Sequence, residues 1–205
     1  MNEKNKKGTI HPLALLAEEA YQVVSEMGFE IVTGPELESE WYNFDVLNVP
    51  KDHPARDMQD TFWIKDQKEK VLRTHTTGVT AWATEQAAKD GRIPSAFISV
   101  GKVFRNEATD ATHEMQFFQI DGSMLGRIED GFSLTNMKGV LANFYKKMLG
   151  PDVEIEFRPS FFPFTEPSIE VFAKFNGKWL EMMGGGMTNP AVIRNIGLDS
   201  NKVQC

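Results

Sequence analysis

Five segments of this chain are rich in β-branched and aromatic residues, and several of them alternate in period two. Residues of this kind favour β-strands. Two of the segments are separated only by Asn176-Gly177, a dipeptide typical of the tight turn of a β-hairpin. So short a connection joins antiparallel strands, because a parallel pair needs a crossover of about a dozen residues or more. The pattern therefore predicts an antiparallel sheet rather than repeated βαβ units, with strands at Ala96–Arg105, Gln116–Leu125, Val153–Arg158, Ser168–Phe175 and Lys178–Met183.

Helical spacing of apolar residues predicts three helices around this sheet. The predicted class is α+β, an antiparallel sheet with helices packed on it. The polar residues 1–8 are expected to form a flexible N-terminal end, and residues 9–205 a single folded domain. The helices are expected at about Pro12–Gly28, Gly78–Lys89 and Ser133–Leu149, with a short strand at Phe29–Val32.

The charge balance constrains the partners. The 205 residues include 22 Lys and Arg against 29 Asp and Glu, a net charge of −7, so non-specific attraction to nucleic acid or to an anionic membrane is not expected. Cys205 is the single cysteine, which excludes an internal disulfide and favours a reducing compartment. The apolar runs are far shorter than the roughly 20 residues of a membrane helix, and no signal peptide is recognisable. We expect a cytoplasmic protein that does not enter the membrane.

Several common catalytic signatures are missing from the sequence. No Gly-x-x-x-x-Gly-Lys-Ser/Thr phosphate loop is present, and Gly184-Gly185-Gly186 lacks the later glycine of a dinucleotide fingerprint. His113-Glu114 begins like a zinc-protease helix, but Phe117 stands where the second histidine ligand would be. The sequence therefore argues against these three classes of enzyme.

The stretch 104–121 is the richest in side chains that can carry chemistry. Its two ends are expected to be strands, and alternation places two side chains of the first and three of the second on one face each. If the strands pair as a hairpin, all five share a face. Such a floor can bind a phosphate through arginine, stack a heterocycle on phenylalanine and hold an ammonium group. The same spacing also fits a solvated sheet face with an exposed Arg–Glu pair. The five residues are Arg105, Glu107, Phe117, Gln119 and Asp121.

Four other segments are less specific. His75 lies among hydroxyl side chains at an expected strand-to-helix transition, where a structural histidine is also common. The aromatic residues of Phe161–Pro167 can line an apolar pocket or pack in the core around a proline turn. Gly184–Gly186 would let a ligand approach the backbone closely, or would end a strand in a loose turn. Asp52–Asp57 is typical of a charged surface loop.

Seven strings of the chain, taken in order, resemble those of one enzyme family. Together they run from about His11 to Asp199, nearly the whole chain. They are similar to the catalytic core of phenylalanyl-tRNA synthetase alpha subunits, which are class II aminoacyl-tRNA synthetases. The resemblance implies the class II fold, an antiparallel sheet flanked by helices. The strings are Gly34–Glu38, Tyr42–Asn48, Asp52–Phe62, Leu72–Thr76, Phe104–Gly122, Phe157–Pro167 and Leu180–Met187.

The resemblance also implies which residues bind ATP. Arg105 would hold the α-phosphate, Glu107 and His113 would lie around the nucleotide, and Phe117 would stack on adenine. The implied catalytic residues are Arg105, Glu107 and His75. Glu170 and Glu181 would be the carboxylates that face Mg²⁺.

The implied amino-acid site takes in residues from several segments. Gln119 and Asp121 would hold the α-ammonium group of phenylalanine. The remaining residues implied to bind it are His75 and Thr77 near its carboxylate and the reacting phosphate, Phe162 and Phe164 against its ring, and Gly184, Gly185 and Gly186 in the pocket wall.

The reaction implied by the resemblance begins with attack of the phenylalanine carboxylate on the α-phosphorus of ATP, giving phenylalanyl-adenylate and pyrophosphate. The aminoacyl group then passes to the 3′ end of tRNA(Phe). Positioning and charge neutralisation by Arg105 and Mg²⁺ would supply most of the catalysis. The implied partners are a beta subunit and a second alpha subunit, with Pro35 at the subunit interface.

The chain departs from the bacterial pattern in four respects. After His75 the pattern is usually Thr-Ser-Pro-x-Gln, whereas this chain has Thr76-Thr77-Gly78-Val79-Thr80, and Asp121 replaces a glutamate. After the triple glycine, Met187-Thr188-Asn189-Pro190 replaces Met-Val-His-Pro. The family would also continue beyond Cys205 into a third signature with a second ATP-binding arginine. We therefore expect an incomplete core with little or no aminoacylation by itself.

Two alternatives stay open at this point. The first is a non-catalytic, truncated paralogue that binds a nucleotide or an amino acid, or docks on a synthetase subunit. The second is another class II ligase that activates a different amino acid.

Overall fold

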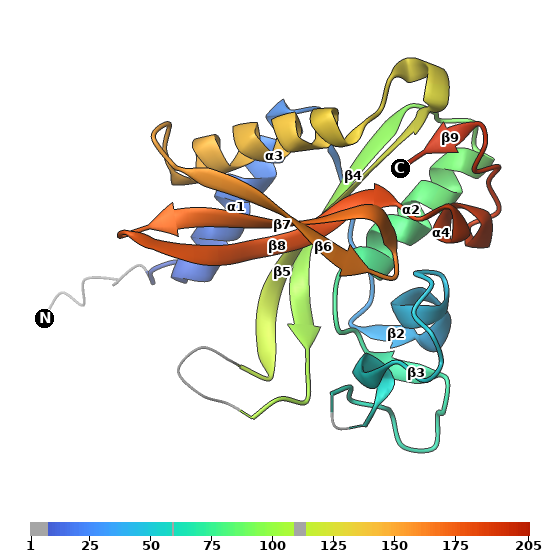
Figure 1. Cartoon of the computed structure of the whole chain (residues 1–205). Coiled ribbons are helices and arrows are strands. Elements are labelled where there is room, and N and C mark those ends of the chain that lie inside the picture. Colours follow the sequence, from blue (N-terminus) through green and yellow to red (C-terminus); the bar gives the residue numbers. More distant parts are fainter. Residues whose placement is uncertain (1–7, 59, 109–113) are drawn as a thin grey trace, which may run out of the picture.

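The computed structural model of the chain describes residues 8–58, 60–108 and 114–205. No helix in these ranges is long and apolar enough to cross a membrane. The chain makes a π-helical turn at Trp41–Asp45 and 3₁₀ turns at Pro54–Arg56 and Ile128–Asp130. In chain order the other elements are α1 (Pro12–Glu26), β1 (Glu30–Ile31), β2 (Leu37–Ser39), β3 (Lys70–Leu72), α2 (Thr77–Lys89), β4 (Ser95–Phe104), β5 (Gln116–Arg127), α3 (Leu134–Leu149), β6 (Ile155–Phe162), β7 (Thr165–Phe175), β8 (Lys178–Thr188), α4 (Pro190–Asn195) and β9 (Val203–Gln204) (Figure 1).

Antiparallel pairing dominates the sheets, as the sequence predicts. The strand orders are β1-β4-β5-β9, β2-β3 and β6-β7-β8. The pairs β4–β5, β6–β7 and β7–β8 are all antiparallel, and the expected Asn176-Gly177 turn joins β7 to β8. The edge strand β1 departs from this pattern, because it pairs with β4 in parallel. The chain between these two strands includes α2 and is long enough for a crossover.

The three predicted helices are confirmed, with ends that differ by one or two residues. The side chain of Ser133 accepts a hydrogen bond from the Asn136 amide at 3.4 Å and so caps α3. Gly150, with a φ of 103°, follows its last residue. Lys147 Nζ of α3 lies 2.8 Å from Glu26 Oε2 of α1. These two helices therefore lie against each other on one side of the molecule (Figure 1).

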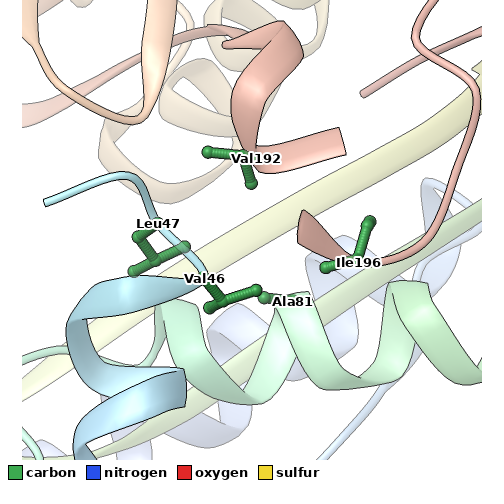
Figure 2. Close-up of a cluster of buried hydrophobic side chains, with 5 residues drawn as sticks. All are labelled: Val46, Leu47, Ala81, Val192 and Ile196. Carbon is green, nitrogen blue, oxygen red and sulfur yellow. The ribbon is translucent and has the colours of Figure 1, made fainter. Parts of the chain in front are cut away.

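The core consists of several apolar clusters. In one of them α3 packs on the β6-β7-β8 sheet, with Tyr145, Ile169 and Val171 buried at the contact. Burial raises the pKa of the Tyr145 hydroxyl to about 12. A second cluster joins α2 to the segment after the π-helical turn and to α4 (Figure 2). This second cluster holds α2 in place through Ala81. Its members are Val46, Leu47, Ala81, Val192 and Ile196.

The strands at the C-terminal side are longer than the sequence indicates. Most of the Phe161–Pro167 segment belongs to the ends of β6 and β7, and Gly184–Gly186 lie within β8. The alternative of a loose turn at the glycines is therefore wrong. Glycine has a low β propensity, but Gly184 and Gly185 pair in register with Glu170 and Ile169 of β7. Cross-strand pairing thus decides the structure here.

Candidate functional site

The hairpin formed by β4 and β5 carries the face predicted from alternation. Gly101 pairs with Gln119 and Ser99 with Asp121. Beyond the end of β4, the Arg105 amide donates to the Met115 carbonyl at 2.9 Å, so the pairing continues to that residue. Paired residues of antiparallel strands point to the same face, which places Arg105 with Phe117, Gln119 and Asp121. The first turn of α2 lies over this face, as its contacts to Asp121 show.

Arg105 and Phe117 form the more open end of this face. The guanidinium carbon of Arg105 lies 5.1 Å from the centre of the Phe117 ring. Its Nε donates to the Thr74 carbonyl at 3.3 Å, and its Nη1 lies 4.0 Å from Glu107 Oε1. The Arg105 side chain is 41% exposed, so several of its five N–H donors remain available to a ligand. This end of the face can bind an anion beside an aromatic ring.

Gln119 and Asp121 form the more enclosed end. Gln119 Oε1 accepts a hydrogen bond from the Thr76 amide at 2.9 Å. Asp121 accepts from the hydroxyl of Thr77 at 3.0 Å and from that of Thr80 at 2.5 Å. Burial raises the pKa of Asp121 to about 6, although both hydroxyls act in the opposite direction by stabilising the anion. Since no cation lies beside it among the described residues, this carboxylate is suited to a cationic ligand.

His75 is held as a neutral imidazole at the start of α2. Burial is the main cause that lowers its pKa to about 4, and the charges of Arg105 and Arg73 act in the same direction. Nε2 lies 2.8 Å from the Asn43 carbonyl, which can only accept, so Nε2 carries the proton. The buried Nδ1 has no hydrogen-bond partner among the described residues. His75 therefore has a buried nitrogen lone pair that no described residue uses.

Phe162, Phe164 and the triple glycine form a second group of the predicted residues. The two rings are stacked, 5.4 Å apart with an angle of 15° between their planes. The Phe162 ring lies directly over Gly184, where an added Cβ would come within 2.4 Å of it. Gly186 has a φ of 159° and faces the Pro167 carbonyl so closely that no side chain fits. The lack of a side chain at Gly184 lets the Phe162 ring pack on the backbone of β8. The lack of one at Gly186 lets β8 approach the Pro167 carbonyl of β7.

Replacement of Gly184 by alanine tests whether this glycine sets the position of Phe162. The new methyl group would collide with the ring, so we expect a loss of about 1–3 kcal/mol in stability and a displaced Phe162. Gly139 of α3 is the matched control, because its Cβ would meet open space and alanine is favoured in a helix. Chemical denaturation of both variants gives the comparison. Equal stability of the two would contradict this account of Gly184.

β9 connects the two groups of residues. It pairs with β5 at Gly126 and Arg127, and the Thr188 amide of β8 donates to the Cys205 carbonyl at 2.6 Å. The Cys205 thiol lies 2.8 Å from the Ser123 hydroxyl of β5. The hairpin floor and the β6-β7-β8 sheet are thereby tied together at this point. The described contacts include none between the side chains of Phe162 or Phe164 and those of Gln119 or Asp121.

The predicted magnesium residues share a face of the second sheet. Glu170 of β7 pairs with Gly184, and Glu181 of β8 pairs with Phe172, two residues further along β7. Glu170 Oε1 accepts a hydrogen bond from Ser160 at 2.8 Å. No cluster of three or more His, Cys, Asp or Glu that could hold a metal is found in the described residues. Two carboxylates still fit Mg²⁺, which usually keeps several waters and binds substrate phosphates as well. His113, also predicted to lie near the nucleotide, lies outside the described residues.

Asn43 and Arg56 are supporting residues that the sequence analysis missed. Asn43 is fully buried and exchanges two hydrogen bonds with Thr74, while its carbonyl accepts from His75. Arg56 bonds Glu40 at 2.8 Å and Asp45 at 2.7 Å, at the two ends of the π-helical turn that carries Asn43. Asp52–Asp57 is therefore not a simple charged surface loop, because the Arg56 side chain is only 5% exposed. Its carboxylate partners lie 11 and 16 positions upstream, a distance that no local pattern reveals.

The sequence of this chain matches one family model and resembles several proteins of known function. Residues 1–205 match the family model of tRNA synthetases class II core domain (F). The phenylalanine–tRNA ligase alpha subunit of Macrococcus caseolyticus is 44% identical over 212 residues, which cover 98% of this chain and 58% of that protein. The corresponding subunit of Bacillus mycoides is also 44% identical, covering 96% and 59%. The chain thus spans a little under three fifths of the length of these curated relatives.

Solved structures support the same architecture. The pyrrolysyl-tRNA synthetase PylSc of Desulfitobacterium hafniense superposes with a TM-score of 0.71, over 94% of this chain and 64% of that one. A second structure of pyrrolysyl-tRNA synthetase from that organism gives a TM-score of 0.69. The sequence identities are 16% and 17%, so these matches establish the class II fold alone.

Proposed function

Because this chain belongs to the family of class II tRNA synthetase core domains and is a homologue of the catalytic core of phenylalanine–tRNA ligase alpha subunits, we propose that it is the catalytic core of an enzyme that activates phenylalanine with ATP. The product is phenylalanyl-adenylate, whose aminoacyl group is then transferred to tRNA(Phe). The observation that carries the proposal is the shared hairpin face. It combines an open arginine beside an aromatic ring with an enclosed amide and carboxylate. These are the groups that a nucleotide phosphate, a base and an ammonium require.

At the open end, Arg105 binds the α-phosphate and Phe117 stacks on the adenine. Glu107 completes the surroundings of the nucleotide, and for His113 the nucleotide-binding role is the one that the resemblance implies. The guanidinium neutralises charge on the phosphate oxygens as the bond from the phenylalanine carboxylate to phosphorus forms and the bond to pyrophosphate breaks. Glu170 and Glu181 would hold Mg²⁺, which supplies further charge neutralisation when bound. The phenylalanine carboxylate already carries its charge, so no covalent enzyme intermediate is needed.

At the enclosed end, Asp121 and Gln119 hold the ammonium group and Thr77 lies beside it. Each carboxylate oxygen of Asp121 accepts one hydrogen bond from a hydroxyl group of α2 and retains a lone pair for the ligand. His75 Nδ1 can accept only, so it suits an N–H of the ammonium better than the substrate carboxylate. We assign the phenyl ring to Phe162 and Phe164, above Gly184–Gly186, since stacked aromatic side chains pack well against such a ring.

The proposal extends to partners and location. With a net charge of −7, this core has no general attraction for tRNA, so contacts outside these 205 residues would supply much of the tRNA affinity. A beta subunit and a second alpha subunit are the proposed protein partners, and the cytoplasm is the proposed location. Leu13, Leu15 and Leu16 of α1 are about half exposed and could contribute to such an interface.

The direct test is amino-acid-dependent exchange of pyrophosphate into ATP. It is made with the subunit that carries this core, assembled with its partner subunits, and with each of the 20 amino acids in turn. We expect exchange with phenylalanine at a rate well above that with the others. Exchange with a different amino acid, and none with phenylalanine, would refute the assignment and favour a class II ligase of another specificity. Binding without any exchange would favour the non-catalytic alternative.

The pKa of Asp121 predicts how phenylalanine affinity depends on pH. The ammonium group needs the ionised carboxylate, and the pKa of that carboxylate is raised to about 6 in the free protein. Affinity should therefore be constant from about pH 7 to 8 and should weaken about tenfold for each unit below pH 6. Calorimetric titration of phenylalanine at several pH values measures this. Constant affinity from pH 5 to 7.5 would show that Asp121 does not bind the ammonium as proposed.

A further inference from the structure

Three threonines on one side of α2 face the polar residues of β5. Thr77, Thr80 and Thr84 recur at the spacing of one helix face, while Asp121 and Ser123 alternate along the strand. Thr77 and Thr80 both donate to Asp121, and Thr84 lies 3.1 Å from the Ser123 hydroxyl. Helix and strand thus meet along a seam of hydroxyl groups. Only its first half contacts the carboxylate assigned to the ligand.

Within this seam Thr80 is the least exposed donor to Asp121. Its relative exposure is 0%, and its hydroxyl reaches Asp121 Oδ2 at 2.5 Å. The same hydroxyl lies 3.1 Å from the Thr77 carbonyl, but it has a single proton, and the charged oxygen is both the closer and the stronger acceptor. With Thr77 on Oδ1 and Thr80 on Oδ2, the carboxylate plane is fixed at both ends. Rotation of the Asp121 side chain would break at least one of these bonds.

The hydroxyl groups of Thr77 and Thr80 are the groups that stabilise the charge of Asp121. Gln119, beside it on β5, is occupied by the Thr76 amide, and Ser99 is its neutral partner on β4. Among the residues that the structure describes, the Cys205 thiol after β9 is a titratable group that responds to the charge of Asp121. Burial is the main reason why the pKa of that thiol is raised, and the charge of Asp121 adds to the effect. A buried carboxylate in these surroundings depends on hydrogen-bond donors to remain ionised.

We propose that Thr80 is a positioning residue for amino-acid recognition, which fixes the Asp121 carboxylate and keeps it in the ionised form that binds the ammonium group. The inference rests on the proposed function. It also connects two departures of this sequence from the bacterial pattern, since Thr80 and Asp121 are in direct contact. An aspartate, one methylene shorter than glutamate, is reached here from the helix by a short hydroxyl side chain.

The test compares Thr80→Val with Thr80→Ser in calorimetric titrations of the full chain with phenylalanine. Valine keeps the shape of threonine but removes the donor to a charged group, so affinity at pH 7.5 should fall about 10- to 100-fold. Serine keeps the hydroxyl and should restore affinity to within about threefold of the wild type. In Thr80→Val, the pH below which affinity declines should also rise above that of the wild type. Loss of packing alone would not change the pH at which the affinity begins to decline.

Thr84→Val is the matched control, because it removes a buried hydroxyl from the same helix that does not touch Asp121. It should leave phenylalanine affinity within about threefold. The proposal is overturned if Thr80→Val binds as the wild type does, if Thr80→Ser fails to restore binding, or if Thr84→Val loses as much. Should Thr80→Val not fold by circular dichroism, Thr80→Ala takes its place under the same criteria. Failure of the wild type to bind phenylalanine would instead show that the proposed function is wrong, before any variant is compared.

Discussion

Arg105→Gln is expected to lower phenylalanine-dependent pyrophosphate exchange about 100- to 1000-fold. Glutamine removes the charge and the fork of N–H donors that meet the α-phosphate, and groups of this kind commonly contribute a factor of this size. The affinity for phenylalanine alone should change little, because Gln119 and Asp121 do not depend on contact with Arg105. Exchange kinetics and phenylalanine titration together separate the two effects.

Arg92→Gln is a close control for this variant. Arg92 also pairs with a glutamate, at 2.8 Å from Glu30, and its guanidinium carbon lies 5.7 Å from the ring centre of Phe97. It therefore has partners of the same kind as Arg105, but it lies at the opposite end of β4, since Phe97 is eight positions before Arg105. Exchange by Arg92→Gln should stay within about twofold of the wild type. A comparable loss in both variants would mean that Arg105 acts through the fold rather than on ATP.

Asp121→Asn is expected to abolish measurable phenylalanine binding while making the fold more stable. Loss of the anion removes the charge partner of the ammonium, which should cost about 100-fold or more in affinity. The folded state holds the pKa of Asp121 at about 6, above its ordinary 3.8, so the ionised form is disfavoured by folding. The cost to stability is absent well below pH 3.8, where the carboxyl is protonated in both states, grows as the pH rises from about 3.8 to about 6, and is fully present above that range. At pH 7.5 the asparagine variant should gain about 1–3 kcal/mol.

Chemical denaturation of Asp121→Asn and the wild type at pH 7.5 and at pH 4 measures the predicted change in stability, and phenylalanine titration measures the loss of affinity. The gain at pH 7.5 should shrink to a small fraction at pH 4, where Asp121 is protonated in the wild-type fold and only partly ionised in the unfolded chain. Asp152→Asn, at an exposed turn, should alter neither stability nor phenylalanine affinity. A destabilised Asp121→Asn at pH 7.5 would contradict the view that this site holds its charge for a ligand.

The hairpin face could be predicted from sequence because its residues are close along the chain. Alternation in two neighbouring strands is sufficient to put Arg105 and Gln119 on the same face once the strands pair. The helices were equally accessible, since their apolar periodicity and end signals are local. The resemblance to a known family supplied roles that spacing alone leaves open. Phe162, Phe164, Glu170 and Glu181 owe their assigned roles to it.

The supports of the site could not be predicted, because they come from distant segments. Asn43 reaches Thr74 and His75 across some 30 residues, and Arg56 finds its carboxylates through the fold. Thr80 was recognised only as a departure from a pattern, and its contact with Asp121 depends on how α2 packs on β5. The parallel pairing of β1 is likewise a tertiary feature, for which a two-residue strand leaves no local signal.

The most direct test of the account is a crystal structure with a non-hydrolysable analogue of phenylalanyl-adenylate, which spans both ends of the site. We predict that its adenine stacks on Phe117, that the group replacing the phosphate contacts Arg105, and that its ammonium lies between Gln119 and Asp121. The phenyl ring should lie against Phe162 and Phe164. An analogue bound away from the hairpin face, or one whose ammonium makes no contact with Asp121, would contradict the assignment.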